Sequence, residues 1–394
     1  MRRFILIAVI AVVAIFTAEI VLTSEAAALG KRVIVVFDPA SSPQERRAVV
    51  VSNNCSIIKE LSIVPAIVIH LPEQASDKAR EAILKHAPVI TIEEDLIVEA
   101  TKKPADKPGK PGGGDPPPQP EEVLPWGVDE IDAELAWPNS TGVGVKVAVV
   151  DTGIDTEHPD LADNIAGGAN IINPRKHYKD DNGHGTHVAG IIAAVNNETG
   201  VIGVANEASL YGVKVLDRKG LGWLSDVIAG LEWCINNGMN VVNMSLGLTA
   251  DSPTFHAAII AVNNAGIVQV AAAGNVGAPA DYPAAYSETI AVAASDSAGN
   301  VVPWSNYGPE IDIAAPGAEI FSTYKGSTYE TLDGTSMATP HVAGVAALIL
   351  ENQPSYTPAD VLGVITSTAD DLGFPAVRQG AGLVDAEEAV LVTE

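Results

Sequence analysis

Residues 334–344 read GTSMATPHVAG, and the apolar run Val345–Leu350 follows them directly. A glycine turn that leads into a helix leaves Ser336 in the first helical turn, beside backbone N–H groups that have no intrahelical partner. The positive end of the helix dipole stabilises negative charge there, which suits an acyl-transfer nucleophile. The alternative is that Ser336 is an ordinary N-cap, and for an isolated GTS sequence that alternative is the better one.

Two further stretches favour the catalytic interpretation of Ser336. Residues 145–153 read VKVAVVDTG, a β-branched run typical of a buried strand that carries Asp151 to its carboxyl end. Residues 182–190 read NGHGTHVAG, a turn followed by a helical pattern that begins near His184. Such element ends are where an open α/β sheet places its sites. We therefore expect an acid, a base and a nucleophile, in the chain order Asp, His, Ser.

This order and the three motifs resemble the subtilisin-like serine proteases, and the resemblance extends from about Leu124 to the C-terminus. It implies that Ser336 is the nucleophile and that His184 is the general base and then the general acid. It further implies that Asp151 orients the imidazole and stabilises the imidazolium. The chain is thus expected to be a subtilisin-like serine endopeptidase that acts on polypeptides.

The alternatives are weaker. His187 and His341 match family positions that are not catalytic. An α/β-hydrolase esterase would show the order Ser, Asp, His and a GxSxG elbow, whereas Ala338 stands where the second glycine should be. A catalytically silent, subtilase-like binding module is the remaining rival, but every catalytic position is filled here.

The composition is that of a globular protein with large buried cores. The 394 residues are 47% hydrophobic and 18% charged. A formal net charge of −26 argues against nucleic acid as a partner. The two cysteines, Cys55 and Cys234, fall in segments that we expect cleavage to separate, so no structural disulfide is expected in the mature enzyme.

The N-terminus resembles a secretory signal peptide, assigned to residues 1–28. A basic start precedes the apolar run Phe4–Phe16, and the small residues SEAAA follow at 24–28. The alternative is an uncleaved membrane anchor that extends to Leu22. Because the uninterrupted apolar run is shorter than the ~20 residues that a span needs, we expect removal, secretion to the extracellular space and no stable membrane anchor.

Residues 29–100 show a β-α-β-β-α-β pattern, the ferredoxin-like arrangement. The resemblance implies that this domain is an N-terminal propeptide, which acts as an intramolecular chaperone and then as an inhibitor. The expected strands are Arg32–Phe37, Cys55–Leu61, Ala66–Leu71 and Val89–Glu94, and the expected helices are Pro43–Val51 and Glu73–His86.

Residues 101–121 are rich in proline and glycine and form an expected solvated linker before the catalytic domain, residues 122–394. A protease can bind such a linker of its own chain in extended form. We expect the processing site between Glu99 and Lys103, centred on Ala100 and Thr101, and the sequence does not fix the bond.

From Trp126 onward, strand patterns alternate with helix patterns. This alternation predicts a parallel sheet with helices on both faces, which is the subtilisin-like α/β fold. The expected strands are Lys146–Val150, Leu210–Val215, Val241–Met244, Ile267–Ala272 and Thr289–Ala293, and the expected helices are Gly185–Val195, Leu224–Asn236 and Pro253–Asn264.

The resemblance also assigns residues that hold the substrate. Asn275, in the stretch AAAGNVG, would donate to the oxyanion together with the backbone N–H of Ser336. A substrate would add to the enzyme as an extra strand. The expected contacts are Leu221 and Gly222 on one edge, and Ser245, Leu246, Gly247, Ala272, Ala273 and Gly274 around the primary specificity pocket.

The loop VNNETGV at residues 195–201 resembles the family's calcium loop. Hard oxygen donors, several of them neutral, suit a structural Ca²⁺ better than Zn²⁺ or Mg²⁺. A further family ligand, a glutamine, aligns here with Glu122, and Gln119 lies nearby. The other implied ligands are the carbonyls of Val195, Thr199 and Val201, the Asn197 side chain and the Asp160 carboxylate.

Asp281 precedes Tyr282 in a stretch that the family uses for the floor of the specificity pocket. A buried carboxylate there would favour Lys or Arg before the scissile bond. The alternative is that a shortened loop turns Asp281 towards solvent or a cation.

Overall fold

The computed structural model describes residues 31–72, 76–101 and 119–392. The chain divides into two compact units, Met1–Leu96 and Ile97–Glu394. The predicted signal peptide and most of the predicted linker lie outside the described residues. Within the described ranges, no helix is both long enough and apolar enough to cross a membrane.

The first unit has the element order that the sequence predicts. Its antiparallel sheet has the strand order β2-β3-β1-β4, and the core formed by Val33, Val35, Ile67 and Ile69 is buried. The N-cap Ser42 and Glu45 form a capping box that starts the first helix. The elements are β1 (Arg32–Phe37), α2 (Pro43–Ser52), β2 (Ser56–Leu61), β3 (Ala66–His70), α3 (Ser76–Leu84) and β4 (Val89–Glu94).

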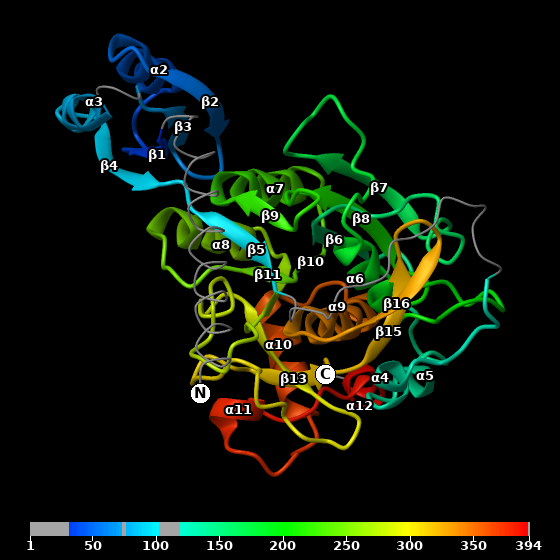
Figure 1. The fold of residues 1–394 in the computed structure, drawn as a ribbon. Helices are drawn as coiled ribbons and strands as arrows, with labels where there is room; N and C mark the ends of the chain where they lie inside the picture. Colours follow the sequence, from blue (N-terminus) through cyan, green and yellow to red (C-terminus); the bar gives the residue numbers. More distant parts are fainter. Residues whose placement is uncertain (1–30, 73–75, 102–118, 393–394) are drawn as a thin grey trace, which may run out of the picture. The chain divides into compact units, whose positions relative to one another are not determined.

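The second unit is built on a seven-stranded sheet with the order β14-β13-β12-β10-β6-β8-β7, and all of its neighbouring strands run parallel (Figure 1). The sequence predicts five of these strands to within two residues. It misses the two edge strands, and β7 carries two adjacent glycines that weaken its strand signal. The strands are β6 (Lys146–Asp151), β7 (Ile165–Asn170), β8 (Ser209–Lys214), β10 (Val241–Met244), β12 (Val268–Ala272), β13 (Ile290–Ser295) and β14 (Ile313–Pro316).

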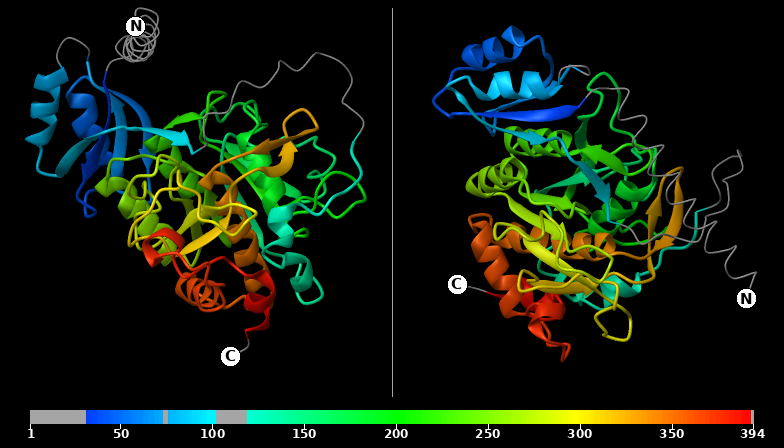
Figure 2. Two further views of the ribbon diagram at one scale, coloured as in Figure 1. Left: turned by 60° about the horizontal axis from the view of Figure 1, so that its bottom comes forward. Right: turned by 60° about the vertical axis from the view of Figure 1, so that its left-hand side comes forward.

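The long helices form two pairs, α6 with α9 and α7 with α8, and each pair packs on the sheet (Figures 1 and 2). Helix α9 is buried along most of its length, which explains why its sequence is apolar all round. The helices are α4 (Trp126–Asp129), α5 (Ala133–Ala136), α6 (His184–Ala193), α7 (Leu224–Asn236), α8 (Pro253–Asn264), α9 (Thr335–Asn352), α10 (Pro358–Ser367), α11 (Ala376–Gln379) and α12 (Ala386–Leu391).

Two smaller sheets complete this unit. β15 (Ile320–Tyr324) and β16 (Thr328–Leu332) form an antiparallel hairpin, seen in orange in Figure 2. β5 (Ile97–Ala100) lies between β9 (Leu221–Trp223) and β11 (Leu246–Gly247) and pairs antiparallel with both. The sequence does not predict β5 as a strand, because its four residues adjoin a proline- and glycine-rich stretch.

The site predicted from the motifs lies at the carboxyl ends of interior strands of the large sheet. β6, β10 and β12 end there, at Asp151, Met244 and Ala272 respectively. Since parallel strands place their carboxyl ends together, the segments that follow these strands converge there.

Candidate active site

Asp151 is the last residue of β6 and is fully buried. One of its carboxylate oxygens accepts a hydrogen bond from the N–H of Thr152 at 2.6 Å. Both carboxylate oxygens lie 2.9 Å from Nδ1 of His184. Since a carboxylate accepts, Nδ1 carries a proton, and Nε2 is the ring nitrogen left to act as a base.

His184 begins α6 because the preceding turn is fixed by hydrogen bonds. The Asp180 carboxylate accepts from the N–H groups of Asn182 and Gly183 at 2.8 and 2.9 Å. It also accepts from the N–H and the hydroxyl of Thr186 at 3.0 and 2.6 Å. Asp180 thus satisfies donors on both sides of His184 and fixes the direction in which the helix starts. The sequence motifs do not predict this role for Asp180.

A glycine lets α6 approach the strand that carries Asp151. A side chain on Gly185 would collide with the Gly153 carbonyl and would lie 3.1 Å from the Asp151 carboxylate. The N–H of Gly185 instead donates to the Thr152 hydroxyl at 2.9 Å. The contact between Asp151 and His184 therefore depends on a close backbone approach that only glycine allows.

Ser336 is the second residue of α9, next to the buried Thr335. Thr335 donates from its N–H and from its hydroxyl to Oδ1 of Asn275, at 2.8 and 2.9 Å. The amide oxygen of Asn275 is therefore occupied, and Nδ2 is turned the other way. On the other side, the hydroxyl of Ser245 donates to the carbonyl of Ser336 at 2.8 Å.

The carbonyl of Thr101 lies between Asn275 and Ser336. Nδ2 of Asn275 donates to this carbonyl oxygen at 2.6 Å, and the Ser336 hydroxyl donates to the same oxygen. The Ser336 hydroxyl also lies 3.1 Å from the carbonyl oxygen of Ser245. A peptide carbonyl of the chain itself is thus held by the side chains predicted as oxyanion donor and nucleophile.

The residues before Thr101 pair with two of the predicted substrate-binding segments. Glu99 pairs with Leu221 on β9 and with Gly247 on β11. The N–H of Ala100 donates to the Gly220 carbonyl at 2.9 Å, and the N–H of Thr101 donates to the Ser245 carbonyl at 3.2 Å. β5 therefore lies between β9 and β11 as an added strand, which is one general mode of peptide binding. We call this position between β9 and β11 the groove.

Nε2 of His184 is buried and has no hydrogen-bond partner among the described residues. The Ser336 hydroxyl is directed at the Thr101 carbonyl instead. The structure therefore brings Asp151 to His184, and Ser336 to Asn275, but it does not join Ser336 to His184 by a hydrogen bond. Such bonds are often long or absent before the reacting complex forms.

The two other histidines of the motifs have structural surroundings. Nε2 of His187 lies within hydrogen-bond distance of the carbonyls of Ile320 and Glu330, and Nδ1 of His341 donates to the Met337 carbonyl. Burial lowers the pKa of His187 to about 3 and the pKa of His341 to about 4. Both rings are neutral at ordinary pH and fill the core.

The predicted calcium ligands gather beside β16. Oδ2 of Asp160 accepts from the N–H of Val201 at 2.8 Å, while Oδ1 is buried with no partner in the described part of the chain. Burial raises the pKa of Asp160 to about 7. Oδ1 of Asn197 accepts from the N–H and the hydroxyl of Thr199, which closes the loop. An orphaned carboxylate oxygen beside a carbonyl-rich loop fits a Ca²⁺ ion.

Glu122 and Gln119 both lie close to this loop. Glu122 accepts from the N–H of Asn197 at 2.7 Å and donates its own N–H to the Glu198 carbonyl. Oε1 of Gln119 accepts from the Tyr329 hydroxyl at 2.9 Å. Within the described ranges, no group of three or more His, Cys, Asp or Glu side chains is arranged to hold a metal ion.

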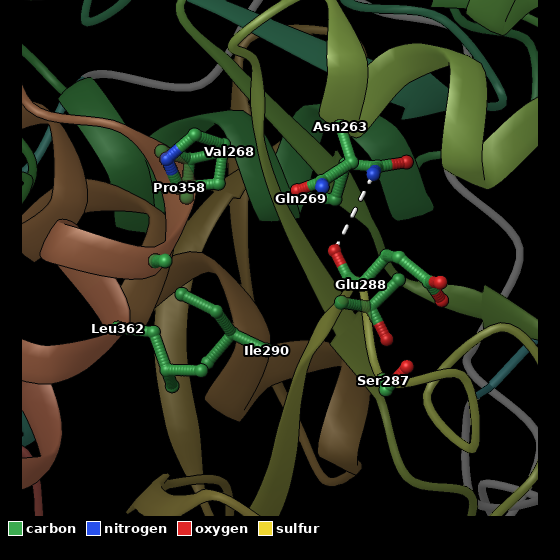
Figure 3. A pocket seen from close by; sticks show the side chains of 10 residues that line it. Asn263, Val268, Gln269, Ser287, Glu288, Ile290, Pro358 and Leu362 are labelled. Carbon is green, nitrogen blue, oxygen red and sulfur yellow. Dashed lines mark hydrogen bonds between the residues drawn. The ribbon is translucent and has the colours of Figure 1, made fainter.

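A separate pocket lies at the amino ends of β12 and β13 (Figure 3). Val268 and Ile290, the first residues of β12 and β13, line it together with Leu362 of α10. Gln269 donates there to the Glu288 carbonyl at 3.4 Å. None of the predicted catalytic, substrate-binding or metal-binding residues lines this pocket.

The sequence matches the model of the subtilase family over residues 142–383. A thermostable alkaline protease of Halalkalibacterium halodurans is 53% identical over 270 residues, which are 68% of this chain and 74% of that protein. Subtilisin BL of Lederbergia lenta is 50% identical over 270 residues, 68% of this chain and 99% of that protein.

Similarity also extends beyond the residues that these two relatives match. Subtilisin NAT of Bacillus subtilis subsp. natto is 41% identical over 372 residues, which are 91% of this chain and 90% of that protein. A match of this length includes part of the chain before residue 122.

Proposed function

Because the chain belongs to the subtilase family and is a subtilisin-like serine endopeptidase, we propose that Asp151, His184 and Ser336 carry out its peptide hydrolysis. We further propose that the first bond cut is Thr101–Lys102 of its own chain. The observation that carries this proposal is the Thr101 carbonyl, which accepts hydrogen bonds from both Asn275 and Ser336.

The groups are suited to each step of acyl transfer. The oxygen of Ser336 attacks the Thr101 carbonyl carbon, and Nε2 of His184 takes the hydroxyl proton. Asp151 stabilises the imidazolium that forms, since it already accepts from Nδ1. Nδ2 of Asn275 donates to the oxyanion, and its direction is fixed because Thr335 occupies the amide oxygen.

Collapse of the tetrahedral intermediate breaks the bond to Lys102. His184 returns its proton to the leaving amine, and Thr101 remains esterified to Ser336. Water then attacks the ester with His184 again as base, which releases the Thr101 carboxylate and restores the hydroxyl. After cleavage β5 is a product strand in the substrate groove, so the N-terminal unit acts as an inhibitor until it is removed.

The remaining parts of the precursor follow from this proposal. Residues 1–28 act as a secretory signal peptide and direct the protein to the extracellular space. Residues up to Thr101 act as propeptide, which is supported by the ferredoxin-like first unit and by β5 in the groove. Polypeptides with extended segments are the substrates that such a groove accepts.

We also infer a structural Ca²⁺ at the loop of residues 195–201. Asp160, Asn197 and the carbonyls of Val195, Thr199 and Val201 would hold the ion, with Glu122 as a further carboxylate. The orphaned Oδ1 of Asp160 supports this assignment. The bound ion supplies positive charge that ties the loop to the mature N-terminal segment.

Kinetics on a peptide substrate test the catalytic assignment. Ser336→Ala is expected to lower kcat by about 10⁶-fold, the loss seen for the equivalent change in subtilisin.

Asn275→Leu is expected to lower kcat by ~10²–10³-fold with little change in KM, again as in subtilisin. An Asn275→Leu enzyme with unchanged kcat and a raised KM would contradict the oxyanion role, and an active Ser336→Ala enzyme would contradict the whole proposal.

A further inference from the structure

Asp281 is fixed between the two walls of the predicted specificity pocket. Its N–H donates to the Ala273 carbonyl, just after β12, at 2.8 Å. The next residue, Tyr282, exchanges backbone hydrogen bonds with Leu248, just after β11, at 2.9 and 3.0 Å. These bonds on both sides set the position from which the Asp281 side chain starts.

Two glycines leave the space into which that side chain extends. A methyl group on Gly247 would lie 3.3 Å from Cβ of Asp281 and 3.3 Å from Cγ2 of Thr101. A methyl group on Gly274 would collide with Oδ2 of Asp281. The side chain of Asp281 and the side chain of Thr101, whose carbonyl Asn275 holds, therefore lie beside the same glycine of the pocket wall.

The Asp281 carboxylate forms no hydrogen bond or ion pair with any residue of the described ranges. Burial raises its pKa to about 6, and no charged side chain contributes to the shift. The neighbouring amide of Asn306 directs Nδ2 to the Pro279 carbonyl at 3.1 Å and forms no hydrogen bond with Asp281. A half-buried carboxylate without donor or cation is costly, and a cationic side chain that enters the pocket would remove this cost.

We propose that Asp281 makes this endopeptidase select Lys or Arg as the residue that contributes the scissile carbonyl. The proposal rests on the proposed function, since it assumes that Thr101 occupies the position of that residue. The threonine of the chain itself is too short and carries no charge, so it leaves Asp281 unpaired. A lysine or arginine in place of Thr101 extends along the same wall and pairs with the carboxylate.

Matched peptides that differ only in the residue before the scissile bond test this proposal. On the wild-type mature enzyme, kcat/KM is expected to be at least tenfold higher for Arg or Lys than for Leu or Phe. Asp281→Asn, which keeps the shape and removes the charge, should lower the Arg value tenfold or more and leave the Leu value within threefold. Glu310→Gln removes the same charge from an exposed site and should change neither value.

The outcomes separate the two proposals. If the wild type cuts Leu and Phe peptides faster than Arg peptides, or if Asp281→Asn leaves the Arg rate unchanged, the acidic pocket is overturned while Ser336-dependent hydrolysis stands. If no peptide is cut at all, or if Ser336→Ala cuts as fast as wild type, the proposed function itself fails.

A second measurement uses the segment of the chain that already occupies the groove. A synthetic peptide of residues 95–101 with a free carboxyl end is a product inhibitor under the proposed function. Thr101→Arg in this peptide should tighten inhibition of the wild type at least tenfold and inhibition of Asp281→Asn less than threefold. Equal tightening on both enzymes would assign the gain to the longer side chain alone and would overturn the role of Asp281.

Discussion

Asn275 uses both ends of its side-chain amide. Its oxygen accepts from two donors of Thr335, and its nitrogen donates to the Thr101 carbonyl. Fixed donors of this kind need no reorganisation when charge develops on the oxygen, which is why they accelerate acyl transfer. Asp180 acts differently, because its carboxylate accepts hydrogen bonds from Asn182, Gly183 and Thr186 and so orders the turn around His184.

Motif residues and supporting residues differ in how well a sequence predicts them. Long motifs contain Asp151, His184, Ser336 and Asn275. The structure brings these residues to the carboxyl ends of the strands of the large sheet. The role of Asp180 depends on donors that only the folded turn gathers around it. No local pattern distinguishes Asp180 from a surface aspartate, so it could not be predicted.

The buried histidine His341 gives the fold a predictable response to acid. Its folded-state pKa of about 4 lies below the ordinary value of 6.5, so between these pH values the unfolded chain binds a proton that the folded chain does not. Stability is therefore lost as the pH falls through this window, by about 2 kcal/mol per such histidine between pH 7 and pH 5.

Denaturant unfolding at pH 7 and pH 5 measures this effect in a Ser336→Ala background, which removes self-digestion. His341→Asn keeps a donor for the Met337 carbonyl and is expected to be less stable at pH 7. It should lose about 2 kcal/mol less than its parent between the two pH values. Parallel losses in the two proteins would show that His341 is protonated in the folded state.

At the scale of elements, β5 lies between β9 and β11, which come from distant parts of the chain. Four residues with one charged side chain give no clear strand signal, and both pairing partners are more than 100 residues away in sequence. The large sheet is easier to predict, because β6, β10 and β12 are rich in valine and alanine. Pairing between short, distant segments is a tertiary property that local patterns do not contain.

The two apolar residues of β5 are expected to differ in how much they contribute to binding. Val98 is fully buried, whereas Ile97 is 44% exposed. In a synthetic peptide of residues 95–106, Val98→Ala removes two buried carbons, worth ~1.6 kcal/mol or roughly tenfold in kcat/KM. Ile97→Ala is the matched control and should change kcat/KM less than threefold. Equal losses would contradict the strand register at β5.

At the scale of the whole molecule, the inferred calcium site links a loop after α6 to residues that precede α4. A ligand that binds only the folded state stabilises it by ~4 kcal/mol at a thousandfold excess over Kd. In the Ser336→Ala protein, millimolar calcium is therefore expected to raise the melting temperature relative to EDTA. Asp160→Asn should abolish this increase.

Asp163→Asn is the control for this experiment, because Asp163 is an exposed carboxylate on the same segment as Asp160. It should retain the calcium-dependent increase. Equal melting temperatures in calcium and in EDTA for the parent protein would remove the ion from the proposed function. A full increase in Asp160→Asn would move the site elsewhere.

The proposed function predicts that this chain is a precursor that cuts itself at the segment held between β9 and β11. The most direct test is to fold the purified wild-type precursor with calcium and to identify its products by intact-mass and N-terminal analysis. We expect two fragments, one ending at Thr101 and one beginning at Lys102, that remain together until the first is degraded. The Ser336→Ala precursor should stay uncut under the same conditions. A first cut at any other bond, or a cut Ser336→Ala precursor, would contradict the assignment of Thr101 to the active site.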